Sequence, residues 1–194
     1  MASASPRRAE ILRDAGIAFE VQAAIVDESR RAGESPGDYV RRLALEKARI
    51  AADAAAELDS REYLVVGADT VVVAEEEILG KPASEEDARR MLRRLSGATH
   101  EVHTGLTVLR RPGSDERVAD EITRVTFAPL SAEDIESYVA TGEPFDKAGA
   151  YAIQGIGGRY ITRIEGCYFN VVGLPLARLW SLLQELGCDD AAPR

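Results

Sequence analysis

The chain has 194 residues, of which 45% are apolar and 29% are charged, and its formal net charge is −9 at pH 7. This length suits one large domain or two small ones, and the mixed composition argues against global disorder. The acidic balance argues against electrostatic binding of nucleic acid polymers. A ligand with several phosphates would need a local basic island in such a protein.

Cysteines and apolar runs bear on the compartment. Cys167 and Cys188 are the only two cysteines; they provide neither a metal framework nor a disulfide scaffold, which fits a reducing cytosol. No apolar run approaches the ~20 residues of a membrane span, and no signal-peptide pattern opens the chain. We therefore expect a soluble, cytoplasmic protein with neither a membrane nor a nucleic acid polymer as partner.

The chain opens with serines and arginines at the start of a helix predicted over residues 7–15. Ser5 suits the N-cap position, and Ser3, Arg7 and Arg8 lie beside it. The N-terminal end of a helix presents unpaired N–H groups and partial positive charge, which favour an anion. The alternative is a capped surface helix whose arginines are solvated.

Two candidate charges flank the start of the second predicted helix. A strand is expected over Phe19–Val26, and Glu28 follows it in a polar loop. Ser35 and Asp38 form a capping box that starts a long helix with an apolar stripe. Lys47 lies near the edge of that stripe. Taken alone, Glu28 and Lys47 are most simply solvated surface charges.

The apolar stretch Tyr63–Val66 predicts a strand that runs into Asp69 and then three valines. Lys81 follows twelve residues after the aspartate, between a glycine and a proline. An aspartate at the exit of a buried strand is costly unless something pairs with it. In open α/β sheets, ligands bind beyond the carboxyl ends of the strands. We expect Asp69 and Lys81 to share a phosphate-binding crevice; the simpler alternative for Asp69 is a turn or cap residue.

The middle of the chain predicts further helices and strands, with capping boxes at Ser84 and Ser131. His100 and His103 stand close together, but strand residues alternate faces and no third ligand is evident, so a metal site there is not favoured. The expected elements are a helix ending at Gly97, antiparallel strands over Glu101–Leu109 and Arg117–Ala128, a helix over Ile135–Thr141, strands over Arg159–Ile164 and Cys167–Val172, and a helix from Gly173 to Gly187.

Residues 143–158 are rich in glycine but keep apolar anchors. Such a segment lets backbone approach a ligand closely. It is neither a Walker loop nor a dinucleotide fingerprint. Lys147 and Gln154 are its polar side chains with recognition capacity; the alternative is a structured connector without a ligand.

The organisation expected is a single domain over residues 1–194, of α/β class. A long mixed β-sheet would be flanked by helices, with two lobes around a central cleft. The cleft would bring together charges and polar groups from distant parts of the chain: Arg7, Lys47, Asp69, Lys81 and Gln154.

Six segments stand in order along the chain: Ala2-Ser-Ala-Ser-Pro-Arg-Arg, Gly67-Ala-Asp-Thr-Val-Val, Leu79-Gly-Lys-Pro, Leu95-Ser-Gly-x-x-His, Asp146-Lys-Ala-Gly-Ala-Tyr-Ala-Ile-Gln-Gly and Asn170-Val-Val-Gly-Leu-Pro. Together they resemble the Maf (septum formation inhibitor-like) family. The resemblance implies a nucleoside triphosphate pyrophosphatase that cleaves between the α- and β-phosphates with a divalent cation, Mg²⁺ or alternatively Mn²⁺ or Co²⁺. It also implies an α/β fold around a long mixed sheet, often in a homodimer.

The same resemblance assigns roles to single residues. Asp69 matches the family's proposed proton acceptor, and Glu28 matches an active-site acidic residue that we assign, with Asp69, to the metal. Positions of the phosphate site are matched by Ser3, Arg8, Lys47 and Lys81, to which we add Lys147 as a substrate-binding residue. Whether Asp69 acts as base or as metal ligand stays open, because a metal can itself acidify water.

Substrate choice is implied by three further positions. Arg7, Thr70 and Gln154 match those that separate the dTTP/UTP branch from the branch acting on 7-methyl-GTP. The amide of Gln154 can donate to and accept from a pyrimidine edge. One methyl group is worth only ~1–3 kcal/mol, so dTTP and UTP are both expected substrates, with modified pyrimidine nucleotides as further candidates. The alternatives are a pyrophosphatase for 7-methyl-GTP or other modified nucleotides, and a non-catalytic nucleotide-binding regulator of cell division.

Overall fold

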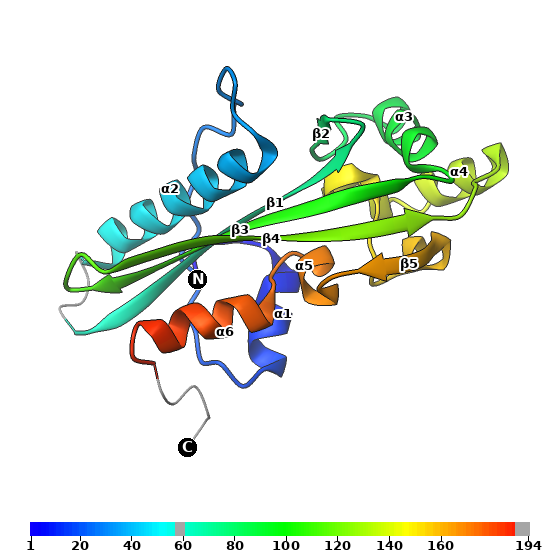
Figure 1. Cartoon of the computed structure of the whole chain (residues 1–194). Coiled ribbons are helices and arrows are strands. Elements are labelled where there is room, and N and C mark those ends of the chain that lie inside the picture. Colours follow the sequence, from blue (N-terminus) through cyan, green and yellow to red (C-terminus); the bar gives the residue numbers. More distant parts are fainter. Residues whose placement is uncertain (57–60, 189–194) are drawn as a thin grey trace. The chain divides into compact units, whose positions relative to one another are not determined.

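The structure is a computed structural model and describes residues 1–56 and 61–188. Its elements, in chain order, are α1 (Pro6–Asp14), α2 (Pro36–Ala56), β1 (Tyr63–Ala74), β2 (Glu77–Leu79), α3 (Glu85–Leu95), β3 (Thr99–Arg111), β4 (Glu116–Phe127), α4 (Ala132–Val139), the 3-10 turns η1 (Glu143–Asp146), η2 (Ala148–Ala150) and η3 (Ile156–Tyr160), β5 (Ile161–Glu165), α5 (Tyr168–Val172) and α6 (Leu176–Glu185) (Figure 1). None of the helices in this described part combines the length and apolar character needed to cross a lipid bilayer.

The sheet has five strands in the order β2-β1-β3-β4-β5. β1 pairs antiparallel with β2, with Val72 opposite Leu79, and β4 pairs antiparallel with β5. The α/β class with helices flanking the sheet is confirmed, but the strands pair antiparallel where we expected a mixed sheet. One cause is the tight turn of Glu75 and Glu76, with φ of 49° and 69°, because two left-handed residues suit a two-residue hairpin.

The chain folds into two compact units. The first comprises Met1–Asp69, Thr104–Glu121 and Gly173–Arg194, and the second comprises Thr70–His103 and Ile122–Val172. β1, β3 and β4 therefore each contribute residues to both units. The single domain with two lobes and the cleft shared by them stay predictions.

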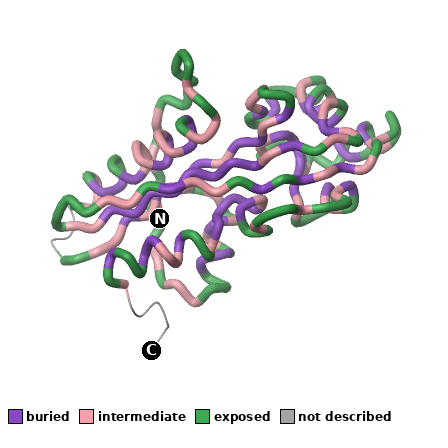
Figure 2. The backbone as a smooth tube through the Cα atoms, viewed as in Figure 1, coloured by how far each residue is buried: buried purple, intermediate pink, exposed green. Residues whose placement is uncertain are grey.

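In the first unit, α2 packs closely on β1 and β3. A Cβ atom on Gly67 would lie 2.1 Å from the carbonyl oxygen of Ala44, and one on Gly105 would lie 2.2 Å from that of Val40. Glycine at both positions therefore lets the helix backbone approach the strands. The predicted apolar stripe of α2 is buried (Figure 2): Val40, Leu43, Ala44, Ala48, Ala51 and Ala52.

The second unit is built around a buried cluster that α3 and α4 cover. Ser84 accepts from the backbone N–H of Asp87 at the start of α3, and Ser131 with Asp134 forms a complete capping box at the start of α4, as predicted. His100 packs edge-on against two members of the cluster, Phe127 and Tyr151. Burial lowers its pKa to about 4, and its Nε2 lies 2.8 Å from the Tyr151 hydroxyl. The aromatic and larger aliphatic members include Met91, Leu92, Leu95, Phe127, Tyr138 and Tyr151.

Two predictions about strands in the first unit are wrong. Residues 19–26 form no strand; Gln22 N–H donates to the Met1 carbonyl oxygen, but Ile25 is 93% exposed, so the apolar alternation does not face a core. Asp69 lies within the twelve-residue strand β1 and not at its end. The three valines that follow it favour continued strand.

A third prediction, the strand over Cys167–Val172, is also wrong, because Tyr168–Val172 form the short helix α5. Asn170 is fully buried there and donates through Nδ2 to the Val102 carbonyl oxygen at 3.0 Å and to Thr123 Oγ1 at 2.9 Å. These tertiary hydrogen bonds outweigh the strand propensity of the aromatic and β-branched residues in the segment.

Candidate active site

Three charged side chains of the first unit meet beside β1. Lys47 Nζ, from α2, donates to Asp69 Oδ1 at 2.6 Å and to Glu28 Oε1 at 2.7 Å. The side chains of Lys47 and Asp69 are 13% and 12% exposed, whereas that of Glu28 is 61% exposed. The structure thus joins three residues predicted from separate parts of the sequence, in a group that is open to solvent at Glu28.

The charge state of Asp69 is shifted by its surroundings. Burial raises the pKa of the Asp69 carboxyl above its ordinary value, although the Lys47 ammonium and the Arg8 guanidinium both act to lower it. An ordinary aspartate, with a pKa of about 4, is a weak base. A carboxylate with a raised pKa is a better proton acceptor; whether Asp69 serves as base or as metal ligand stays a prediction.

Arg8 anchors the N-terminal segment to β1 and to the start of the last helix. Its buried guanidinium donates through Nε to the Gly173 carbonyl oxygen at 2.7 Å, and through Nη1 to that of Ala68 at 2.8 Å and to Ser3 Oγ at 3.0 Å. Ser3 Oγ also accepts from the Ser5 N–H at 3.2 Å. Ser5 occupies the N-cap position as predicted, but within the described residues its side chain makes no capping bond.

The donor set beside Lys47 fits a hard divalent cation. Glu28 and Asp69 direct one oxygen each at a single cationic nitrogen, so the two carboxylates already converge on one position of positive charge. Magnesium in nucleotide enzymes is commonly held by one or two carboxylates together with substrate phosphates. The described residues contain no group of three or more His, Cys, Asp or Glu that could hold a metal; the remaining ligands would therefore come from phosphate or water.

In the second unit, a backbone hydrogen bond joins the two segments that carry the predicted substrate lysines. The Gly149 N–H donates to the Gly80 carbonyl oxygen at 3.0 Å. Lys81, next to Gly80, is exposed. Lys147 is mostly buried and forms an ion pair with Asp146. The fold therefore brings the segments of Lys81 and Lys147 together, and their binding of phosphate stays a prediction.

Glu143 braces the glycine-rich segment. Its Oε1 accepts from the Tyr138 hydroxyl at 2.7 Å and from the Gly157 N–H at 3.0 Å, and its Oε2 accepts from the Ile156 N–H at 3.0 Å. Burial acts to raise the pKa of Glu143, but these donors outweigh it and the pKa is lowered. The brace fixes the turn that presents Gln154, which is exposed.

Other positions divide into those predicted and those missed. Arg7 and Thr70 are both half-buried, and their roles in specificity stay predictions. Sequence reasoning missed Glu143, whose partners lie five to fourteen residues away. It also missed Tyr39 and Arg42, which contact the segment of Glu28. None of these three belongs to a local motif, so the sequence offered no signal for them.

Comparison with known proteins gives a consistent result. A family model described as "Maf-like protein" matches residues 1–186. Proteins named dTTP/UTP pyrophosphatase are similar over most of the chain. That of Koribacter versatilis (strain Ellin345) is 52% identical over 187 residues, 96% of this chain and 93% of the relative. That of Anaeromyxobacter sp. (strain Fw109-5) is 53% identical over 190 residues, which are 96% of this chain and 88% of the relative. That of Moorella thermoacetica is 51% identical over 189 residues, which are 97% of this chain and 95% of the relative.

Proposed function

The chain belongs to the family of Maf-like proteins, and from that premise we propose that it is a nucleoside triphosphate pyrophosphatase. It hydrolyses dTTP and UTP to the monophosphate and pyrophosphate, with modified pyrimidine nucleotides as further substrates. The names of relatives at about half identity support this activity. The observation that carries it is the contact of Lys47 with both Glu28 and Asp69, because it places a base and a cation together.

The chemistry asks these side chains to position a water molecule and to neutralise phosphate charge. Asp69 takes the proton of the attacking water, helped by its raised pKa. Lys47 releases one of its two carboxylate partners and binds a phosphate oxygen of the substrate. Phosphate binding is proposed for four further residues as well: Ser3, Arg8, Lys81 and Lys147. Such catalysis consists mainly of positioning and electrostatic stabilisation.

A divalent cation belongs to the same proposal. Glu28 and Asp69 would hold Mg²⁺, or alternatively Mn²⁺ or Co²⁺. Bound there, the ion would neutralise phosphate charge and lower the pKa of a water molecule. If Asp69 serves chiefly as metal ligand, its carboxylate orients the water and the ion supplies the acidity; otherwise the carboxylate is itself the base.

Base selection is proposed for Gln154, with Arg7 and Thr70 shaping the site around it. The exposed amide of Gln154 is presented on a braced turn, which supports a role in reading a base. An amide pairs equally well with uracil and thymine edges, so the enzyme accepts both bases.

The experiment that tests this function measures pyrophosphate release over a panel of nucleotides with Mg²⁺, Mn²⁺ or Co²⁺. We expect the highest kcat/KM for dTTP and UTP. Preferred release from 7-methyl-GTP, or tight nucleotide binding with no release from any member of the panel, contradicts the proposal. The second outcome is the one expected of a non-catalytic regulator.

Three further expectations accompany the activity. We propose a single domain over residues 1–194, which the family match over residues 1–186 supports. A homodimer follows from the family resemblance alone, and sedimentation equilibrium of the purified chain tests it. A cytoplasmic location fits the paucity of cysteine and is tested by fractionation of cells.

A further inference from the structure

The segment that carries Glu28 has no regular secondary structure of its own. Residues 17–31 form neither helix nor strand, and Ile25 within them is 93% exposed. Segments of this kind lose much conformational entropy when they are fixed. A carboxylate that has to face Lys47 from such a segment therefore needs an anchor elsewhere in the fold.

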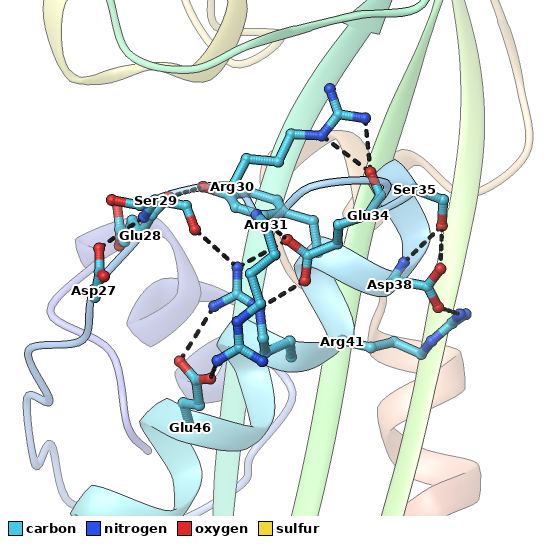
Figure 3. Close-up of polar contacts among 12 residues, drawn as sticks. Asp27, Glu28, Ser29, Arg30, Arg31, Glu34, Ser35, Asp38, Arg41 and Glu46 are labelled. Carbon is cyan, nitrogen blue, oxygen red and sulfur yellow. Dashed lines mark hydrogen bonds and ion pairs between the residues drawn. The ribbon is translucent and has the colours of Figure 1, made fainter.

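Arg42 of α2 binds both ends of the loop that follows Glu28. Figure 3 labels the two ends, Ser29 and Glu34. Its Nε and Nη2 donate to Glu34 Oε1 at 2.6 Å and Oε2 at 2.9 Å, and its Nη2 also donates to the Ser29 carbonyl oxygen at 3.1 Å. A bidentate pair of this kind is geometrically specific. The contact with Arg42 lowers the pKa of Glu34 to about 2, so the pair stays ionised near neutral pH.

Tyr39 contacts Glu28 itself. Its hydroxyl donates to the Glu28 carbonyl oxygen at 2.7 Å, and its ring lies 5.4 Å from the Arg42 guanidinium carbon. Tyr39 and Arg42 are three residues apart on α2 and therefore neighbours on one face of the helix. Lys47 follows on the same helix, about one and a half turns after Arg42. The helix is itself fixed against the sheet by the two close glycine contacts described above. One rigid element thus carries both the lysine and the anchors of the carboxylate that the lysine contacts.

We propose that Arg42 and Tyr39 are positioning residues that hold Glu28 against Lys47, a proposal that rests on the function proposed above for that site. Neither side chain contacts the substrate or the metal; each acts through the backbone around Glu28. When Arg42 is removed, Lys47 keeps its contact with Asp69, while Glu28 loses its fixed place.

The first test needs no nucleotide and no metal. Amide hydrogen exchange of residues 27–35 is measured in the full chain carrying Arg42→Gln. We expect exchange there to be roughly tenfold faster than in the unmodified protein, as for a locally opened loop. The matched control is Arg41→Gln: Arg41 is the next residue of α2 and also contacts two carboxylates, Asp38 at 2.7 Å and Asp120 at 2.5 Å. Neither partner lies in the loop, and Asp38 contacts only its last residue, Ser35, at 2.6 Å. Exchange of residues 27–34 should therefore not change in the control.

The second test separates positioning from simple stability. Arg42→Gln should lower kcat by roughly 10- to 100-fold, the usual range for groups that orient a metal ligand, with little change in KM because Lys47 is intact. In a Glu28→Gln background the same substitution should cost little more, because two residues that act through one group are not additive.

Unchanged exchange of residues 27–35 in Arg42→Gln, or losses in kcat that add fully in the double variant, would overturn the proposal. If Arg42→Gln does not fold, Tyr39→Phe replaces it, because it removes one hydroxyl and keeps the ring. That variant should show the same pattern at smaller amplitude, and unchanged exchange in it would also overturn the proposal. A wild-type protein that releases no pyrophosphate contradicts the proposed function and leaves the exchange result standing.

Discussion

Each unit of the molecule contains a carboxylate on which several contacts converge, and the fold shifts the pKa values of the two in opposite directions. Asp69 of the first unit is buried against an ammonium group, and burial raises its pKa. Glu143 of the second unit is surrounded by two backbone N–H groups and a hydroxyl, which outweigh burial and lower its pKa.

This difference suits Asp69 to a role in the reaction and Glu143 to a structural role. The backbone N–H groups that donate to Glu143 are fixed in place and keep its carboxylate ionised and hydrogen-bonded. Glu143 therefore holds the conformation of the glycine-rich segment. Asp69 is paired instead with Lys47, a flexible side chain that can turn to another anion. A raised pKa combined with a specific charge partner is the usual mark of a reactive group.

Removing the charge of Asp69 should have the largest effect on activity. We expect Asp69→Asn to lower kcat for dTTP and UTP by roughly 10²- to 10⁴-fold, the usual contribution of a general base, while nucleotide binding stays measurable by calorimetry. Because the folded protein disfavours this ionised carboxylate, the variant should unfold at the same temperature as the wild type or higher. Near-normal turnover would remove Asp69 from the mechanism.

Removing Glu143 should affect stability before chemistry. Glu143→Ala leaves the Tyr138 hydroxyl and two backbone donors without their acceptor, at a cost of about 2 kcal/mol. For a chain of this size that lowers Tm by roughly 4–8 °C. KM should rise more than kcat falls, because the turn presenting Gln154 is loosened. Glu143→Gln keeps one acceptor oxygen, so its Tm should lie between those of the wild type and Glu143→Ala. An unchanged Tm in Glu143→Ala would show that the brace is dispensable.

Substitution of Gln154 should change preference more than speed. Gln154→Ala removes the donor and acceptor proposed to read the base, so relative kcat/KM values among UTP, dTTP and 7-methyl-GTP should shift by roughly tenfold, as expected for one hydrogen-bonding group. The measurement is the same nucleotide panel. A uniform loss across all three nucleotides would place Gln154 outside base recognition.

The smallest predicted effect is a pair of opposite pH trends in stability. The folded state lowers the pKa of Glu143. Ionised Glu143 therefore stabilises the folded protein above the pKa of an unfolded glutamate, about 4.3, and this stabilisation is lost as pH falls. The folded state raises the pKa of Asp69. Protonated Asp69 therefore stabilises the folded protein fully below the pKa of an unfolded aspartate, about 3.9, and this stabilisation is lost as pH rises. Urea unfolding should therefore show that Glu143→Gln lowers the free energy of unfolding, relative to the wild type, most at pH 7. Asp69→Asn should raise that free energy at pH 7 and raise it least at low pH. Parallel trends would contradict the comparison.

The sequence predicted much of the framework because the framework is local. The apolar stripe of α2 and the capping box at Ser131 are visible within a few residues, and both are in the structure. The box predicted at Ser84 is present only in part, because Asp87 N–H donates to Ser84 Oγ but the Asp87 carboxylate accepts from the Ala83 N–H. The β1–β2 hairpin was missed because Glu75 and Glu76 give none of the usual turn signals. The strand predicted over Cys167–Val172 failed because Asn170 is held by residues about fifty or more positions away.

The residues of the candidate site could be named from the sequence, whereas the residues that hold Glu28 in place could not. Family resemblance brought Glu28, Lys47 and Asp69 to one function, and the structure shows how two of them contact the third. Tyr39 and Arg42 carry no motif, and their importance follows only from where the loop after Glu28 lies in space. Supports of this kind depend on tertiary contacts, which no periodicity or spacing encodes.

In the proposed reaction, a water molecule whose proton Asp69 accepts attacks the α-phosphorus of the nucleotide. Hydrolysis of UTP in water enriched in ¹⁸O, with mass spectrometry of both products, tests it most directly. We predict one ¹⁸O atom in the monophosphate and none in the pyrophosphate. Label in the pyrophosphate, with none in the monophosphate, would mean attack at the next phosphorus and would contradict the account.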